Sequence, residues 1–259
     1  MNEQDQIIDF GVGDDLALLH IEAESNFDDG EYEGALMRYL EVFNGSRGRT
    51  DWQEKRLTII LADLAALADV YEPAMQCLVE MRDQKEALIT SGQDLTCINE
   101  WAALNGQIEP ERTLNVYFKL KAEGSKHGAA LSLIRQTAAS QIVGRRLYDE
   151  LDRETLAFMQ KKLLLHESKL LSDKESDYSS EDEQEEVIEA TIEALLKVAL
   201  ELFEAAAALK EGDIGREVMT KYLAYGQPNS HSQLIAAAKK AKNSVWVEGL
   251  EQLAREGKS

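Results

Sequence analysis

The residues that most often carry metal or nucleophilic chemistry are few and scattered in this chain of 259 residues. A metal ligand or a catalytic base would first be sought among the histidines, and a reactive thiol among the cysteines. These residues are His20, His127, His166, His231, Cys77 and Cys97. None of them falls into an HExxH motif, a CxxC pair or another ligand spacing. We therefore expect no catalytic residue, no cofactor site and no metal site.

An acidic stretch that begins at residue 173 is superficially similar to a calcium-binding loop. Asp173, Glu175 and Asp177 stand at alternate positions, as carboxylate ligands do in such loops. However, Tyr178 stands where a glycine must turn the chain, and Gln184 stands where a bidentate glutamate must bind. The stretch therefore does not predict a calcium site.

Acidic residues dominate the composition. The 48 aspartates and glutamates exceed the 28 lysines and arginines, which gives a formal net charge of −20. Such a charge repels the phosphates of nucleic acids and anionic membrane surfaces, and it attracts basic polypeptides. Lys239, Lys240 and Lys242 precede Trp246, but three lysines at a helix end are better explained as complements to the helix dipole. We expect a basic protein partner, no nucleic acid and no membrane.

The N-terminal residues and the hydropathy pattern bear on location. Residues 1–10 contain neither the basic nor the apolar block of a secretory signal. No run of about 18 apolar residues occurs, and the most apolar segment, residues 190–209, carries charges at helical spacing. We expect a cytoplasmic protein.

The elements that must position any site are predicted to be helices. Apolar residues recur at three- and four-residue intervals through residues 57–67, 95–104 and 114–120, as one buried helical face requires. No window alternates apolar and polar residues with enough β-branched content for a strand. The periodicity predicts an all-α fold of about a dozen helices joined by short turns.

The spacing of small and aromatic residues suggests an internal repeat. The first copy contains Ala23, Phe27, Gly30, Tyr32, Ala35 and Tyr39. Small residues suit a close helix crossing, and the glycine permits a positive φ at the end of the first helix. A second copy follows 39 residues later, with Asp69 in place of the turn glycine. Its corresponding residues are Ala62, Ala66, Tyr71, Ala74 and Leu78.

This pattern resembles the tetratricopeptide repeat (TPR), with degenerate copies. The resemblance implies an α-solenoid of antiparallel helix pairs, because one pair alone cannot bury its apolar stripe. Such curved surfaces usually bind another protein. An unrelated helical bundle would explain the apolar stripes equally well, but not the Gly-x-Tyr-x-x-Ala spacing.

The TPR resemblance also implies where a partner binds. Ligands of such solenoids usually lie on the concave face, which the first helix of each pair lines. Carried over position by position, that face contains His20, Glu24, Phe27, Asp28, Arg56 and Asp63. The three carboxylates among them would form an acidic lining for a basic partner. The alternative is that these carboxylates only make the surface soluble.

Charge also suggests a division of the chain. Residues 173–189 contain nine acidic residues and one lysine, and like charges at this density oppose compaction. We expect TPR-like helical repeats over residues 1–171, an acidic linker or loop over 172–186, and C-terminal repeats with a cap helix over 187–259.

These observations favour a non-catalytic protein that captures a basic polypeptide on an acidic helical surface. A bacterial toxin-neutralising immunity protein is the leading hypothesis, because many toxins are basic nucleases with which acidic inhibitors associate rapidly. A TPR-type chaperone or adaptor for a secreted protein is the alternative. A helical enzyme with a site built from distant carboxylates is a further alternative.

Overall fold

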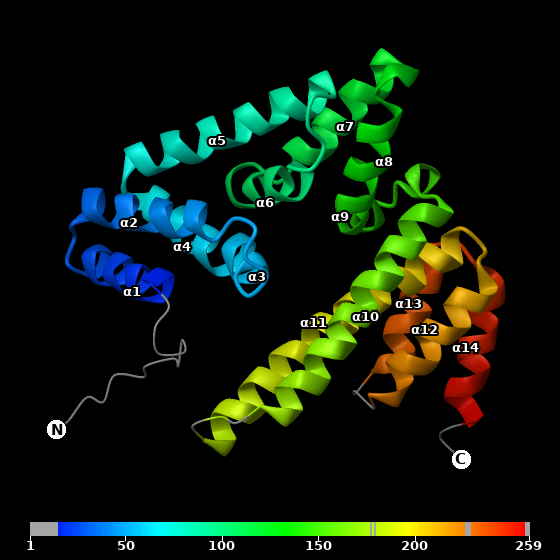
Figure 1. Cartoon of the computed structure of the whole chain (residues 1–259). Helices are drawn as coiled ribbons and strands as arrows, with labels where there is room; N and C mark the ends of the chain where they lie inside the picture. The colour runs from blue at the N-terminus through cyan, green and yellow to red at the C-terminus, as the bar shows by residue number, and fades with distance from the viewer. Residues whose placement is uncertain (1–14, 177, 179, 226–228, 257–259) are drawn as a thin grey trace. The chain divides into compact units, whose positions relative to one another are not determined.

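The protein is described by a computed structural model over residues 15–176, 178, 180–225 and 229–256. The prediction of an all-α fold is confirmed, because these residues form helices and contain no strand (Figure 1). The chain divides into two compact units, residues 1–130 and 131–259.

In the first unit, most helices pack against a neighbour along the chain. The bounds are α1 (Asp15–Asp28), α2 (Tyr32–Gly45), α3 (Gln53–Lys55), the π-helical turn η1 (Arg56–Ile60), α4 (Leu61–Val70), α5 (Glu72–Ser91), α6 (Ile98–Ile108), α7 (Arg112–Glu123) and the 3₁₀ turn η2 (Ser125–His127). Helix α1 packs on α2, and α4 packs on α2, α5 and α6 (Figure 1). These helix pairs are compatible with a repeat-like fold.

The small residues of the first helix pair lie in the packed interior, as their spacing predicts. Ala23 of α1 and Ala35 of α2 are completely buried. Between them, Gly30 has a φ of +76°, a value that a residue with a side chain rarely adopts. The amide of Gly30 donates to the Phe27 carbonyl at 3.1 Å, and the amide of Glu31 donates to the Asn26 carbonyl at 2.8 Å, which closes the end of α1.

The predicted register of the second copy is wrong in its first helix. Ala62 and Ala66 are exposed, whereas Leu64 and Leu67 are fully buried. The reason is the length of the turn. Three residues separate α1 from α2, but Tyr71 alone separates α4 from α5. The buried positions of α4 therefore lie two residues later in the sequence than the 39-residue spacing from α1 predicts.

The second unit is built around a long helical hairpin. Its elements are α8 (Gly128–Thr137, which begins at the end of the first unit), α9 (Ala139–Gly144), the 3₁₀ turn η3 (Tyr148–Glu150), α10 (Arg153–Glu175), α11 (Glu181–Ala208), α12 (Gly212–Ala224), α13 (Ser230–Lys240) and α14 (Ser244–Glu256). Helix α11 packs on α10 and on both α12 and α13 (Figure 1). Although α10 and α11 exceed 20 residues, no described helix is apolar enough over the necessary length to cross a membrane.

The core of the second unit centres on the C-terminal half of α11. Leu202, Phe203 and the alanines at 205–207 are almost completely buried. Trp246 of α14 meets Phe203 edge-on, with ring centroids 5.1 Å apart. A Cβ atom on Gly215 of α12 would lie 2.7 Å from Trp246, so this glycine permits a close approach between the backbone and the ring.

Most of the acidic stretch at 172–186 is helical and lies within the second unit. Helix α11 begins after Ser180, whose hydroxyl accepts a hydrogen bond from the Glu183 amide at 3.2 Å. The acidic residues at 181–183 occupy the first turn of α11, where negative charge complements the helix dipole. The position of Asp177, one of the calcium-loop positions considered above, lies outside the described residues.

Candidate functional site: an acidic pocket in the first unit

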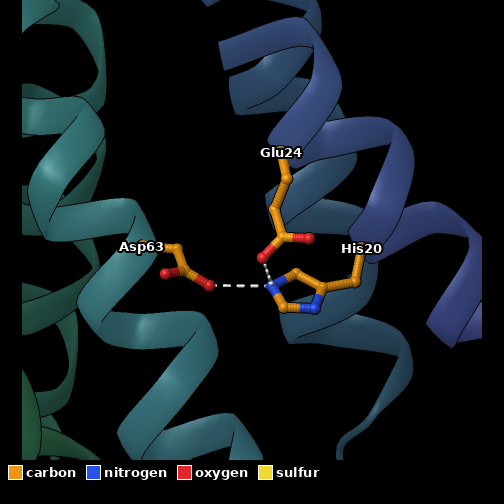
Figure 2. Close-up of side chains that lie close together, drawn as sticks. All are labelled: His20, Glu24 and Asp63. Carbon is orange, nitrogen blue, oxygen red and sulfur yellow. Dashed lines mark hydrogen bonds and ion pairs between the residues drawn. The ribbon is translucent and has the colours of Figure 1, made fainter. Parts of the chain in front are cut away.

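Three side chains from two helices meet at one point in the first unit (Figure 2). His20 and Glu24 lie one turn apart on α1, and Asp63 lies on α4. The Nε2 atom of His20 is 2.7 Å from Oδ2 of Asp63 and 3.8 Å from Oε1 of Glu24 (Figure 2). The packing of the first unit therefore brings together residues that are up to 43 positions apart.

Burial distinguishes the three side chains. His20 is only 3% exposed, Asp63 is partly buried and Glu24 is exposed. The imidazole ring also packs against Tyr39 of α2, with ring centroids 5.9 Å apart. The buried ring is thus held by an aromatic neighbour on one helix and a carboxylate on another.

A pocket of about 290 Å³ opens beside these residues. It is lined by Glu24, Phe27, Asp28, Tyr39, Asp63 and Ala66, and we call it the acidic pocket. Among the described residues, no lysine or arginine forms an ion pair with its three carboxylates. Burial raises the pKa of Tyr39, and the negative charges of the three carboxylates raise it further. The pocket therefore combines aromatic residues with three carboxylates that no lysine or arginine of the described residues contacts.

Five of the six residues predicted for the partner-binding face lie together at this pocket. Glu24, Phe27, Asp28 and Asp63 line it, and His20 adjoins it through Glu24 and Asp63. Tyr39, named above only as a member of the first repeat copy, also lines the pocket, and no signal in the sequence indicated this role.

Arg56, the sixth predicted residue, does not lie at the acidic pocket. Its Nε donates to the Phe43 carbonyl at 2.7 Å, and its guanidinium lies 3.9 Å from the centre of the Phe43 ring. Its Nη2 is 2.7 Å from Oε2 of Glu100. Arg56 is 6% exposed, so its surroundings are those of a core residue.

Glu100 is the centre of a buried ionic cluster that the sequence did not predict. Besides Arg56, its carboxylate contacts Lys85 at 2.5 Å and Arg47 at 3.3 Å. Burial would raise the pKa of Glu100, but the close contacts and positive charges of Lys85 and Arg56 together outweigh it and hold the pKa below its ordinary value. These cations come from three separate segments, so only the fold reveals the cluster.

The composition of the acidic pocket suits two kinds of ligand. Its carboxylates and aromatic walls can hold a cationic side chain. Alternatively, one imidazole nitrogen and two carboxylate oxygens can act as metal ligands, because one such atom from each of His20, Glu24 and Asp63 lies within 4.8 Å of the others.

Two larger cavities lie in the second unit. One of about 870 Å³ is lined by residues of α12 and α14, among them Trp246, and by Lys242. The nearby lysines of α13 face glutamates: Lys239 is 3.5 Å from Glu251, and Lys240 is 3.5 Å from Glu204. The other cavity, about 710 Å³, follows α11 and includes three glutamates at 186, 189 and 193.

Comparison with protein families, with curated proteins and with solved structures finds no match to this chain. The geometry and charge of the acidic pocket are therefore the features of this chain that point to a function.

Proposed function

We propose that the first unit is a TPR-like set of helix pairs that binds a basic polypeptide, with a lysine or arginine side chain of the partner in the acidic pocket. The observation that carries this proposal is the convergence of Glu24, Asp28 and Asp63 on one pocket without a lysine or arginine paired to them among the described residues. The proposal involves binding and no catalysis.

The walls of the pocket suit a long cationic side chain. Phe27 and Tyr39 line the pocket, and aromatic side chains there can contact the alkyl stem of a lysine or arginine and interact with its charged end. The three carboxylates can accept hydrogen bonds from an ammonium or guanidinium group, and such charge-assisted bonds are the stronger kind. Removing one partner of a buried interfacial charge pair typically costs about 2–5 kcal/mol of binding free energy.

The charge of the whole chain supports the same class of partner. A net charge of −20 steers a basic protein toward the surface and accelerates association, an effect that salt screens. A toxin-neutralising immunity protein is the role that we propose, since it needs rapid capture of a basic protein. A chaperone or adaptor for a secreted basic protein would use the same contacts and is the alternative.

The test compares two variants with the same change in charge. The site variant carries Glu24→Gln, Asp28→Asn and Asp63→Asn. The control variant carries Glu186→Gln, Glu189→Gln and Glu193→Gln on α11, where all three glutamates are exposed. Each protein is immobilised and exposed to a lysate of the source organism at low ionic strength, and the retained proteins are identified by mass spectrometry.

We expect the wild type and the control variant to retain the same basic protein, and the site variant to lose it. Loss of that protein from both variants would mean that total charge, and not the acidic pocket, holds the partner. Equal retention by all three would refute the pocket as the binding site.

A further inference from the structure

We propose that His20, Glu24 and Asp63 form a binding site for a divalent transition-metal ion of the zinc type. This inference goes beyond the proposed function, because it concerns the free protein and needs no partner. It depends on three potential ligand atoms that lie within 4.8 Å of one another at the wall of the acidic pocket (Figure 2).

Two of the three separations between the ligand atoms are close to those of a tetrahedral site, and the third, between Glu24 and Asp63, is below 4.8 Å. Zinc binds histidine nitrogen and carboxylate oxygen at about 2.0–2.2 Å, which places neighbouring ligand atoms about 3.4 Å apart. The nitrogen of His20 is 2.7 Å from Asp63 and 3.8 Å from Glu24, values on either side of that separation. Metal binding therefore requires the hydrogen bond between His20 and Asp63 to open by about 0.7 Å, with a smaller approach of Glu24.

The arrangement of the ligands on the helices favours chelation. His20 and Glu24 are four residues apart on α1, so both side chains project from the same face. Asp63 faces them from α4. The ring of Tyr39 packs against the imidazole and restricts its rotation, which reduces the entropy that metal binding would cost.

The chemistry of the ligands favours a transition metal. A neutral imidazole with two carboxylates balances the charge of a divalent ion. Imidazole suits zinc, cobalt, nickel and copper, whereas magnesium and calcium prefer sites made only of oxygen. Because Glu24 and Asp63 line the acidic pocket, water in the pocket can complete the coordination.

Occupancy would have two consequences for the first unit. The ion would join α1 to α4 through its ligands and raise the thermal midpoint of unfolding. It would also engage two of the three carboxylates of the acidic pocket, so metal and a cationic side chain would compete for them.

The test is a titration of the full-length protein with Co²⁺, whose visible absorption reports tetrahedral coordination, and with Zn²⁺ by calorimetry. We expect one high-affinity site per chain, and at least tenfold weaker binding by His20→Ala and by Asp63→Asn. Asp63→Asn keeps the shape of the side chain and its ability to hydrogen-bond to His20. Far-UV circular dichroism of each variant checks that the helices are intact.

The matched control is His127→Ala. His127 also lies four residues from a carboxylate, with its Nε2 3.0 Å from Glu123, but it belongs to no three-ligand group among the described residues. We expect this variant to bind both metals as the wild type does. The proposal is overturned if the wild type binds neither metal, if His127→Ala abolishes binding, or if a well-folded Asp63→Asn binds with unchanged affinity. Since the titration contains no partner, its failure would leave the proposed function to its own test.

Discussion

The buried cluster around Glu100 offers the sharpest test of the packing in the first unit. The substitution Glu100→Gln keeps the size of the side chain but removes the negative charge that Arg56 and Lys85 contact. Both cations are nearly buried, with side chains 7% and 12% exposed, so water compensates them poorly. The third cation, Arg47, is 61% exposed and contributes little.

Breaking a buried ion pair by removing one partner typically costs about 3–5 kcal/mol, because the remaining charge stays desolvated. We expect Glu100→Gln to lose about 3 kcal/mol, at the lower end of that range, because the amide oxygen of the new side chain can still accept a hydrogen bond. For a unit of this size, the loss corresponds to a fall of about 10–15 °C in the thermal midpoint.

The assay is urea unfolding of the full chain followed by tryptophan fluorescence, to which the buried Trp52 and Trp101 of the first unit contribute. Glu80→Gln is the control, since Glu80 is exposed on α5, and its effect should remain within about 0.5 kcal/mol. A loss below about 1 kcal/mol for Glu100→Gln would contradict this expectation, because it would mean that water solvates the cluster.

Three further predictions concern pH and backbone geometry. The pKa of Glu100 in the folded protein is lowered from its ordinary value of 4.5. The ionised carboxylate therefore stabilises the fold fully above pH 4.5, and this stabilisation is lost as the pH falls through the lowered pKa. The difference in urea stability between the wild type and Glu100→Gln should shrink as the pH falls through this range. Lys210 has a φ of +61° after α11, so Lys210→Gly should stabilise the second unit by about 1 kcal/mol, and an unchanged urea midpoint would contradict this strain. Gly215→Ala should destabilise the second unit by about 1–3 kcal/mol, because the new methyl group would collide with Trp246. Gly249→Ala should stabilise the unit by up to about 1 kcal/mol, because its methyl group would meet open space. Thermal midpoints that shift in the same direction for both variants would contradict the close approach of Gly215 to Trp246.

Local patterns predicted the helices and the first helix pair. The glycine at position 30 has the positive φ predicted for it, and the alanines at 23 and 35 are completely buried. The register of α4 could not be predicted in the same way. It depends on the single-residue turn at Tyr71, and a two-residue difference in turn length moves every buried position of the helix.

The candidate site shows the same limit. Repeat spacing placed Glu24 and Asp63 on one face, and the structure brings both to the acidic pocket. The same spacing assigned Arg56 to that face, although its guanidinium is buried against Phe43 and Glu100. The sequence around Glu100 does not distinguish it from the other acidic residues, which number 48 in all. Its role in the buried ionic cluster depends on cations from distant segments of the chain.

The acidic stretch illustrates how specific contacts can outweigh a compositional trend. Like charges oppose compaction, yet Asp173 is only 7% exposed at the end of α10. The hydroxyl of Thr191 donates to its carboxylate at 2.6 Å, and the ammonium of Lys169 donates at 3.0 Å. Local compensation of this kind allows a helix to continue into a segment whose composition predicts a loop.

The acidic pocket is tested most directly as the binding site by the equilibrium dissociation constant of the basic partner for the two charge-matched triple variants, measured by calorimetry at physiological salt. Our account predicts that neutralising Glu24, Asp28 and Asp63 weakens binding at least tenfold, a loss of about 1.4 kcal/mol or more, whereas neutralising the three glutamates of α11 weakens it less than about threefold. Equal dissociation constants for the two variants would contradict the assignment of the acidic pocket as the binding site.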